Sequence, residues 1–391
     1  MPVTDHRYSF LRMMAGLALM LLPGCIDPYS PDIRDNQVSL VVEAVITDQP
    51  GNHTITLSRS SPLNDTAFYP EEGAWVFLFD EEGTVREFAE MEPGLYGSWI
   101  GAGELIRGKD YWLHIETGDG EIVESDAEQM ASGCPEVERV YWEFDTLGTA
   151  DPDNPLYGIR FYLDLEGEEE QPRNYRWELE ETWEYQAAYR IQYLYDGTAL
   201  VEWEDPFIYH TCWYTGNIPS IFTASTRALE ENRLMRTPLH FVSSETQRLQ
   251  TRYSLLVRQY ALSDKAYDYW ARIREQNQES GGLYETQPDR VPGNLHHVND
   301  PDQQVLGYFN LSSVSEKRIF VDGIRELVYP PIHCLLDTID RPQDKPPYLS
   351  VPFYLISFSP LGVGPPYGVG SGLCFDCRKG GGINIRPDYW E

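Results

Sequence analysis

The sequence predicts a mainly β protein with two successive β-rich units and one clear α-helix. Short segments alternate apolar with polar residues, and turns rich in Gly and Pro separate them. Aromatic residues make up 13% of the chain, with 26 Tyr and 10 Trp beside 31 Gly and 28 Pro. Aromatic and β-branched residues favour strands, whereas Gly and Pro favour the turns that join them.

The N-terminus has the features of a secretion signal. Arg7 and Arg12 precede a short apolar run from Met13 to Leu22. Crossing a bilayer as a helix takes about 20 apolar residues, so this run is too short to span. A charged start followed by a short apolar stretch and small residues is typical of a signal peptide.

The end of this run predicts a lipid anchor. Leu22-Pro23-Gly24-Cys25 resembles a bacterial lipobox, in which Cys25 becomes acylated after cleavage. We therefore expect residues 1–24 to be a lipoprotein signal peptide and residues 25–36 to be a lipidated tether rich in Pro and Asp. The alternatives are an ordinary signal peptide with a chance cysteine and a buried helix.

Residues 37–131 predict a single β-sandwich. Ser39–Thr47 and His53–Ser60 have the residue pattern of strands. Ala74–Phe88 and Asp110–Ala127 each predict a hairpin around a glycine-containing turn. Helical spacing is absent from this part of the sequence, so we expect strands alone.

Residues 132–391 predict a larger β-rich domain that ends in a cysteine-containing tail. Strands are expected at Gly158–Glu166, Tyr175–Tyr185, Tyr189–Gly197, Thr237–Ser244 and Tyr253–Ser263, and again within Val305–Asp322. The tail from residue 360 to 372 contains so much Gly and Pro that regular structure is not expected there.

One helix is predicted at residues 264–279. Ser263 is a favourable N-cap residue. Ala266, Trp270 and Ile273 follow at helical spacing, so they share one face. We interpret that face as core packing.

A long loop is predicted from Gly281 to Gln304, and loops of this length are often functional. His296 and His297 are weak metal-ligand candidates there, with Asp300 or Asp302 nearby. Adjacent residues of an extended chain point in opposite directions, which favours solvent-exposed histidines over a metal site. We expect no metal and no cofactor.

The cysteines predict disulfides. If Cys25 is acylated, five cysteines remain, so at least one thiol is unpaired within the chain. Glycines surround the C-x-x-C of Cys374 and Cys377, and no helical pattern follows as a redox site would require. Structural disulfides are therefore expected, with Cys212 and Cys334 as natural partners for this pair and the connectivity left open.

Charge and motifs limit the function. The net charge of −32 disfavours nucleic acid as a partner. The sequence contains no H-E-x-x-H, G-x-S-x-G or Walker motif, so we expect a protein that is not an enzyme. Exposed aromatic residues can bind sugars or peptides, and Trp99, Trp213 and Tyr367 are the candidates.

Several segments, in order along the chain, resemble the family known as domain of unknown function 4249. They include LVVEAVITDQPGNHTITLSRS, ALSDKAYDYWARI, VPGNLHHVNDPDQQVLGYFNLSSVSEKRIFV and CFDCRKGGGINIRPDYW. The first domain is similar to transthyretin-like and carboxypeptidase-regulatory sandwiches.

The resemblance implies a Bacteroidota cell-envelope lipoprotein with no established catalytic residue. It also implies a setting beside a TonB-dependent outer-membrane receptor. We therefore expect an outer-membrane lipoprotein, held in the membrane through Cys25, that acts as a binding or accessory subunit of an uptake system. A secreted hydrolase with a carboxylate pair or a His-metal site, and a structural or adhesion module of the envelope, are the alternatives.

Overall fold

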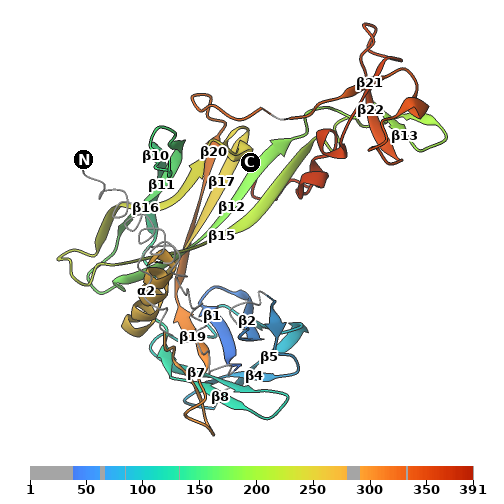
Figure 1. Ribbon diagram of the computed structural model, residues 1–391. Helices are drawn as coiled ribbons and strands as arrows, with labels where there is room; N and C mark the ends of the chain where they lie inside the picture. The colour runs from blue at the N-terminus through green and yellow to red at the C-terminus, as the bar shows by residue number, and fades with distance from the viewer. Residues whose placement is uncertain are drawn as a thin grey trace, which may run out of the picture.

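The computed structural model describes residues 38–61, 67–83, 85–131, 133–279, 291–331 and 333–390. Cys25 and the expected signal peptide, residues 1–24, lie outside these residues. The described chain forms three β-sheet units and one α-helix, as the sequence predicts (Figure 1). No helix within these ranges is both long and apolar enough for a membrane crossing.

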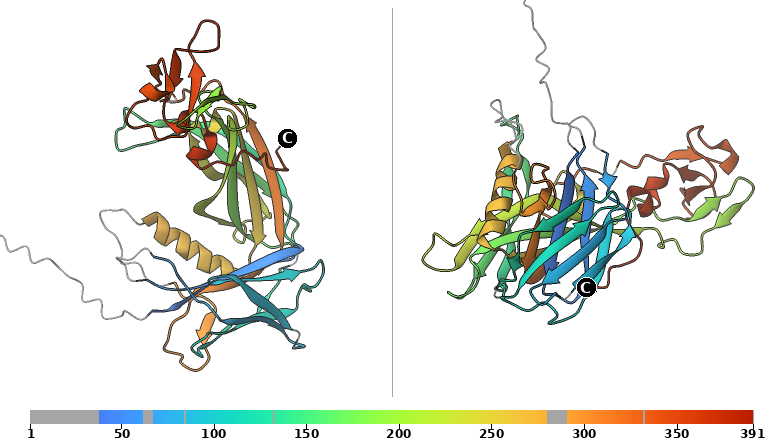
Figure 2. Two further views of the ribbon diagram at one scale, coloured as in Figure 1. Left: turned by 90° about the vertical axis from the view of Figure 1, so that its right-hand side faces the viewer. Right: turned by 90° about the horizontal axis from the view of Figure 1, so that it is seen from below.

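The first unit is an eleven-stranded sheet that folds over itself into a sandwich (Figure 2). The strands pair in the order β18-β8-β7-β4-β5-β6-β2-β1-β19, with β3 beside β2 and β9 beside β7. The strands are β1 (Leu40–Thr47), β2 (Gly51–Arg59), β3 (Tyr69–Pro70), β4 (Trp75–Asp80), β5 (Val85–Glu92), β6 (Leu95–Ile100), β7 (Asp110–Glu116), β8 (Ile122–Ser125), β9 (Glu128–Gln129), β18 (Leu295–His297) and β19 (Leu306–Ser312).

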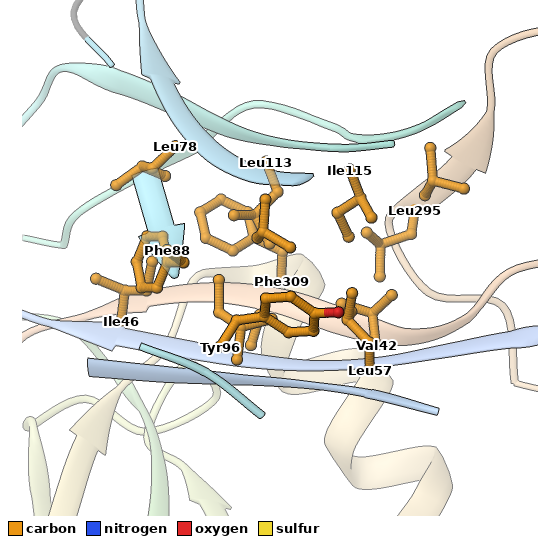
Figure 3. Close-up of a cluster of buried hydrophobic side chains, with 14 of the residues drawn as sticks. Val42, Ile46, Leu57, Leu78, Phe88, Tyr96, Leu113, Ile115, Leu295 and Phe309 are labelled. Atoms are coloured by element: carbon orange, nitrogen blue, oxygen red, sulfur yellow. The ribbon is translucent and has the colours of Figure 1, made fainter. Parts of the chain in front are cut away.

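Alternating residues of these strands form the core between the two layers (Figure 3). Val42 and Ile46 of β1 point into the core, as do Leu113 and Ile115 of β7. Tyr96 is also fully buried, and its hydroxyl donates to the Glu71 carbonyl at 2.8 Å. The period-two pattern of the sequence thus places one face of each strand in the core.

The first sandwich is not confined to residues 37–131. β19 pairs in parallel with β1, and β18 pairs antiparallel with β8. Leu295, Phe309 and Leu311 belong to the same core. The expected boundary at residue 131 therefore omits two strands, because parallel pairing between distant segments leaves no local pattern in the sequence.

The second unit contains two facing sheets around a separate core. One sheet has the order β10-β11-β16 and the other β15-β12-β17-β20. Their elements are β10 (Val137–Leu147), β11 (Leu156–Glu166), β16 (Arg233–Ser243), β15 (Thr211–Ser225), β12 (Asn174–Gln186), β17 (Arg252–Ala261), β20 (Val314–Asp322) and the short 3-10 helix η1 (Gln247–Leu249).

Helix α2 (Asp264–Glu279) confirms the predicted helix. The Ser263 hydroxyl accepts a hydrogen bond from the Ala266 amide at 3.2 Å, which satisfies one of the free N–H groups of the first turn. Ala266 is fully buried, and the ring of Trp270 lies 3.8 Å from the Arg176 guanidinium carbon. The helix packs against β12 and β15.

The third unit, here called the distal unit, is a five-stranded sheet in the order β14-β13-β22-β23-β21. It lies beyond the ends of β12 and β15, on the side of the molecule remote from β1 (Figure 1). Its elements are β13 (Tyr193–Tyr195), β14 (Leu200–Glu202), β21 (Asp337–Ile339), β22 (Phe353–Ser357), β23 (Tyr367–Val369) and the 3-10 helices η2 (Pro342–Asp344), η3 (Gly372–Cys374) and η4 (Cys377–Gly380).

Two segments expected to be irregular contain strands. β18 lies within the expected loop Gly281–Gln304, of which residues 281–290 are outside the described chain. β23 lies within the Gly- and Pro-rich tail. Each is three residues long and pairs with a neighbouring strand, so tertiary contacts rather than local propensity form them.

Candidate functional site

The four cysteines that were expected to form disulfides do form two, at the base of the distal unit. Cys212 bonds to Cys377, and Cys334 bonds to Cys374. The two cysteines of the C-x-x-C therefore have different partners and do not bond to each other. This pairing is typical of structural disulfides rather than of a redox site. Cys134 is the free thiol among the described residues, and burial raises its pKa.

The two candidate metal ligands lie on opposite faces of β18. His296 is exposed, and its Nδ1 is 4.0 Å from Asp126 Oδ1. His297 is buried. The described residues contain no group of three His, Cys, Asp or Glu side chains that could hold a metal ion, so the structure does not bring these histidines together.

The aromatic candidates are also separated. Trp99 is exposed on β6, Trp213 is half-buried on β15, and Tyr367 is buried in the core of the distal sheet. They belong to three different sheets and do not form a common surface.

The distal unit contains a different candidate site, which we define by its lack of charge. Residues 346–375 include no Asp, Glu, Lys, Arg or His. At the chain's 24% content of charged residues, a segment of this length would carry about seven. Six large apolar side chains in this segment are nevertheless exposed: Tyr348, Val351, Phe358, Leu361, Val363 and Leu373.

The loop between β22 and β23, residues 358–366, is the most exposed part of this segment and is called the distal loop below. Leu361 and Val363 are 85% and 63% exposed. Surface patches of contiguous apolar residues on soluble proteins often mark interaction sites. The distal loop therefore has the composition of a contact surface.

Local hydrogen bonds hold the distal loop in one shape. The Ser357 hydroxyl donates to the Gly364 carbonyl at 2.6 Å, and the Phe358 amide donates to the Pro366 carbonyl at 2.8 Å. Gly362 and Gly364 have φ of 74° and 77°, a region that side chains with a Cβ rarely adopt. The loop thus presents Leu361 and Val363 outward without support from a larger core.

A small aromatic core supports the loop from below. Tyr195 and Phe353 have ring centroids 5.4 Å apart, and Tyr193 and Tyr367 contact edge to face at 5.6 Å. The Tyr193 hydroxyl accepts from the Gly364 amide at 3.4 Å. Burial raises the pKa of Tyr367.

An ion pair lies directly after this segment, at its base. Asp376 is almost fully buried, and its carboxylate accepts two hydrogen bonds of 2.9 Å from Arg378. These bonds raise the pKa of Arg378, whose guanidinium carbon also lies 3.3 Å from the Tyr209 ring centroid. Charge is thus compensated at the base and missing from the exposed loop.

Residues 26–318 match the model of a family described as Domain of unknown function (DUF4249). The chain belongs to this family. A search of curated proteins finds no match. A solved structure described as trypsin-activated alpha-2-macroglobulin from Escherichia coli aligns at 12% identity and a TM-score of 0.20. The alignment covers 58% of this chain and 15% of that one.

The family match of this DUF4249 protein ends at Arg318, before the uncharged segment begins. The Gly and Pro content of residues 360–372 predicts irregular structure and hides the strand β23 within the tail. The sequence does contain a signal for the distal loop. The loop lies in a long stretch without charged residues, although the chain as a whole is acidic.

Proposed function

We propose that this protein is a lipid-anchored, non-enzymatic accessory subunit of the outer membrane. In this proposal Cys25 carries the lipid, and the distal loop docks on an apolar surface of a TonB-dependent receptor. The observation that carries the proposal is the exposed, uncharged distal loop in a chain of net charge −32.

A protein surface suits the distal loop because the centres of protein interfaces are depleted of charge and enriched in aromatic residues. The distal unit exposes Tyr348 and Phe358 as well as Leu361 and Val363. Its strands lie at the other end of the molecule from β1, the strand that follows the tether (Figure 1). In this arrangement the lipid and the distal loop contact different partners.

The acidity of the rest of the chain favours this site further. Like charges oppose approach between acidic surfaces, whereas an uncharged apolar loop gains from burial at about 25 cal/mol per Å². Docking is therefore expected at the distal loop rather than elsewhere on the surface.

Site-specific photocrosslinking in cells tests the proposal. A photoreactive residue at Leu361 is expected to form an adduct with a TonB-dependent receptor, identified by mass spectrometry. The same residue at Ile106, which is 57% exposed and lies between β6 and β7 of the first unit, is the control and is expected to give no such adduct.

A second variant confirms the chemistry of the contact. Leu361→Asp together with Val363→Asp places two charges in the loop and is expected to abolish co-purification with the receptor, while membrane attachment is unchanged. Adducts only with lipid or with a second copy of this chain, or equal adducts from Ile106, contradict the proposal.

A further inference from the structure

The second unit contains a pocket of about 550 Å³ at an open edge between its two sheets. Ser220–Thr223 of β15 line one side, Thr237–Leu239 of β16 line the other, and the C-terminal half of α2 forms the rim. This volume lies within the range of small-molecule sites.

The lining of this pocket is basic, which is unusual for this chain. The sequence holds 62 acidic and 30 basic residues, yet the described lining includes Arg160 and Arg274 and no Asp or Glu. A second pocket, between the first and second units, is lined by Glu43, Glu178 and Glu316 as well as by Arg258. A third pocket, around Trp183 and Tyr214, also has no Asp or Glu in its lining, but its arginine, Arg248, pairs with Glu181.

Arg274 supplies a positive charge that has no counter-ion in the part of the chain that the structure describes. Its Nη1 donates to the carbonyl and the hydroxyl of Thr223, both at 2.8 Å, and the Thr223 side chain is buried. Within the described residues it forms no ion pair. Its Nε and Nη2 donate no hydrogen bond there either, so one edge of the guanidinium is unoccupied.

Arg160 differs from Arg274 because it already has a counter-ion. Its Nε lies 2.5 Å from Asp145 Oδ2, and its guanidinium carbon lies 5.3 Å from the Phe241 ring centroid. The described lining of the pocket therefore carries about one net positive charge, which suits a monoanion better than a phosphate or a dicarboxylate.

The remainder of the lining combines polar side chains, namely Ser220, Thr223, Thr237 and Asn277, with a larger set of apolar ones. Trp177 and Leu239 are buried, and Ile221 and Phe222 are half-buried between two prolines, Pro219 and Pro238. A ligand that fills this space needs an apolar body in addition to its charged group.

We propose that this pocket binds an organic monocarboxylate with an apolar body, whose carboxylate accepts hydrogen bonds from Nε and Nη2 of Arg274. This geometry matches the paired, parallel hydrogen bonds that arginine makes with carboxylates. The inference names a ligand for the binding role proposed above, but the pocket is remote from the distal loop and the two are tested separately.

Calorimetric titration of the purified protein tests this inference. The probes are straight-chain and phenyl-substituted monocarboxylates of four to ten carbons, each paired with the alcohol of the same skeleton. At least one carboxylate is expected to bind with submillimolar affinity, and its alcohol at least tenfold more weakly. Arg274→Gln is expected to weaken the carboxylate at least tenfold and to leave the alcohol unchanged.

Two further variants keep the test independent of folding. Arg272→Gln removes an exposed arginine of the same helix that does not line the pocket, and is expected to bind like wild type. Ile221→Trp fills the pocket and is expected to abolish binding; circular dichroism verifies that each variant is folded. Failure of every carboxylate to bind, equal binding of the alcohol, or wild-type affinity in Arg274→Gln overturns the proposal, whatever the crosslinking at Leu361 reports.

Discussion

Glu181 is a buried carboxylate of β12 with a full set of partners. Its two oxygens each accept from Arg248 Nη1 at 2.8 Å, and the Tyr253 hydroxyl donates to Oε2 at 2.8 Å. His240 Nε2 is 4.0 Å from the same oxygen, too far for a hydrogen bond, and is buried without a partner among the described residues. Burial, together with the charges of Arg248 and Arg160, lowers the pKa of His240 to about 4.

This histidine predicts a pH dependence of stability. In the unfolded chain a histidine titrates near 6.5, so between pH 6.5 and about 4 the unfolded state binds a proton that the folded state does not. Stability therefore falls as pH falls through this window, by up to about 3 kcal/mol. We expect His240→Gln to lose less stability than wild type between pH 7 and pH 4.5.

Urea unfolding at the two pH values measures the difference. His114→Gln is the control, since this histidine lies on β7 in the first sandwich, half-buried beside Glu124. Equal losses in wild type and His240→Gln would show that His240 does not remain neutral in the folded state.

At the scale of elements, the disulfide Cys334–Cys374 joins two segments of the distal unit. These residues are 40 positions apart, and short 3-10 helices and turns are the main regular structure around them. A small sheet of short strands has little core of its own, so cross-links contribute a large share of its stability.

The double variant Cys334→Ser and Cys374→Ser is expected to destabilise the distal unit by about 2–4 kcal/mol. Hydrogen exchange monitored by mass spectrometry is expected to show faster exchange in β21, β22 and β23, with unchanged protection in β1 and β7. The free-thiol variant Cys134→Ser is the matched control. Uniform loss of protection across all three units would contradict a local role for this disulfide.

The sequence predicts those elements that are specified by residues close together in the chain. Alternation predicted the hairpins of β4–β5 and β7–β8, and the Ser263 cap with its helical face predicted α2. The pairing of β1 with β19 could not be predicted, because each strand alone has the same alternating pattern whichever partner it takes.

The candidate sites were less accessible from sequence. The uncharged segment could be read directly, but the pocket around Arg274 could not. It needs Thr223 of β15, Leu239 of β16 and α2 to meet, and nothing in the spacing of these residues indicates that they do. Disulfide connectivity likewise depends on which Cα atoms approach within bonding range.

At the scale of the whole molecule, membrane attachment is predicted to depend on Cys25 alone. With a net charge of −32, the body is repelled by anionic lipid headgroups. Cys25→Ser is therefore expected to move the protein from the membrane to the soluble fraction, and 1 M salt is not expected to release the wild type.

Cell fractionation and intact-mass measurement test this prediction. Cys134→Ser is the matched control, because it removes another cysteine but keeps the proposed lipid site. Membrane sedimentation of Cys25→Ser, together with a native protein that has no acyl mass, would contradict the prediction.

The parallel pairing of β1 with β19 also affects how the chain can be made. As the ribosome elongates the polypeptide, the apolar faces of β1 and β2 emerge long before the segment around Phe309 that completes their sandwich. A nascent chain stalled at residue 131 would expose an open hydrophobic layer and an unpaired strand edge, both of which promote aggregation. We therefore expect the nascent chain to be prone to aggregation until translation has passed β19.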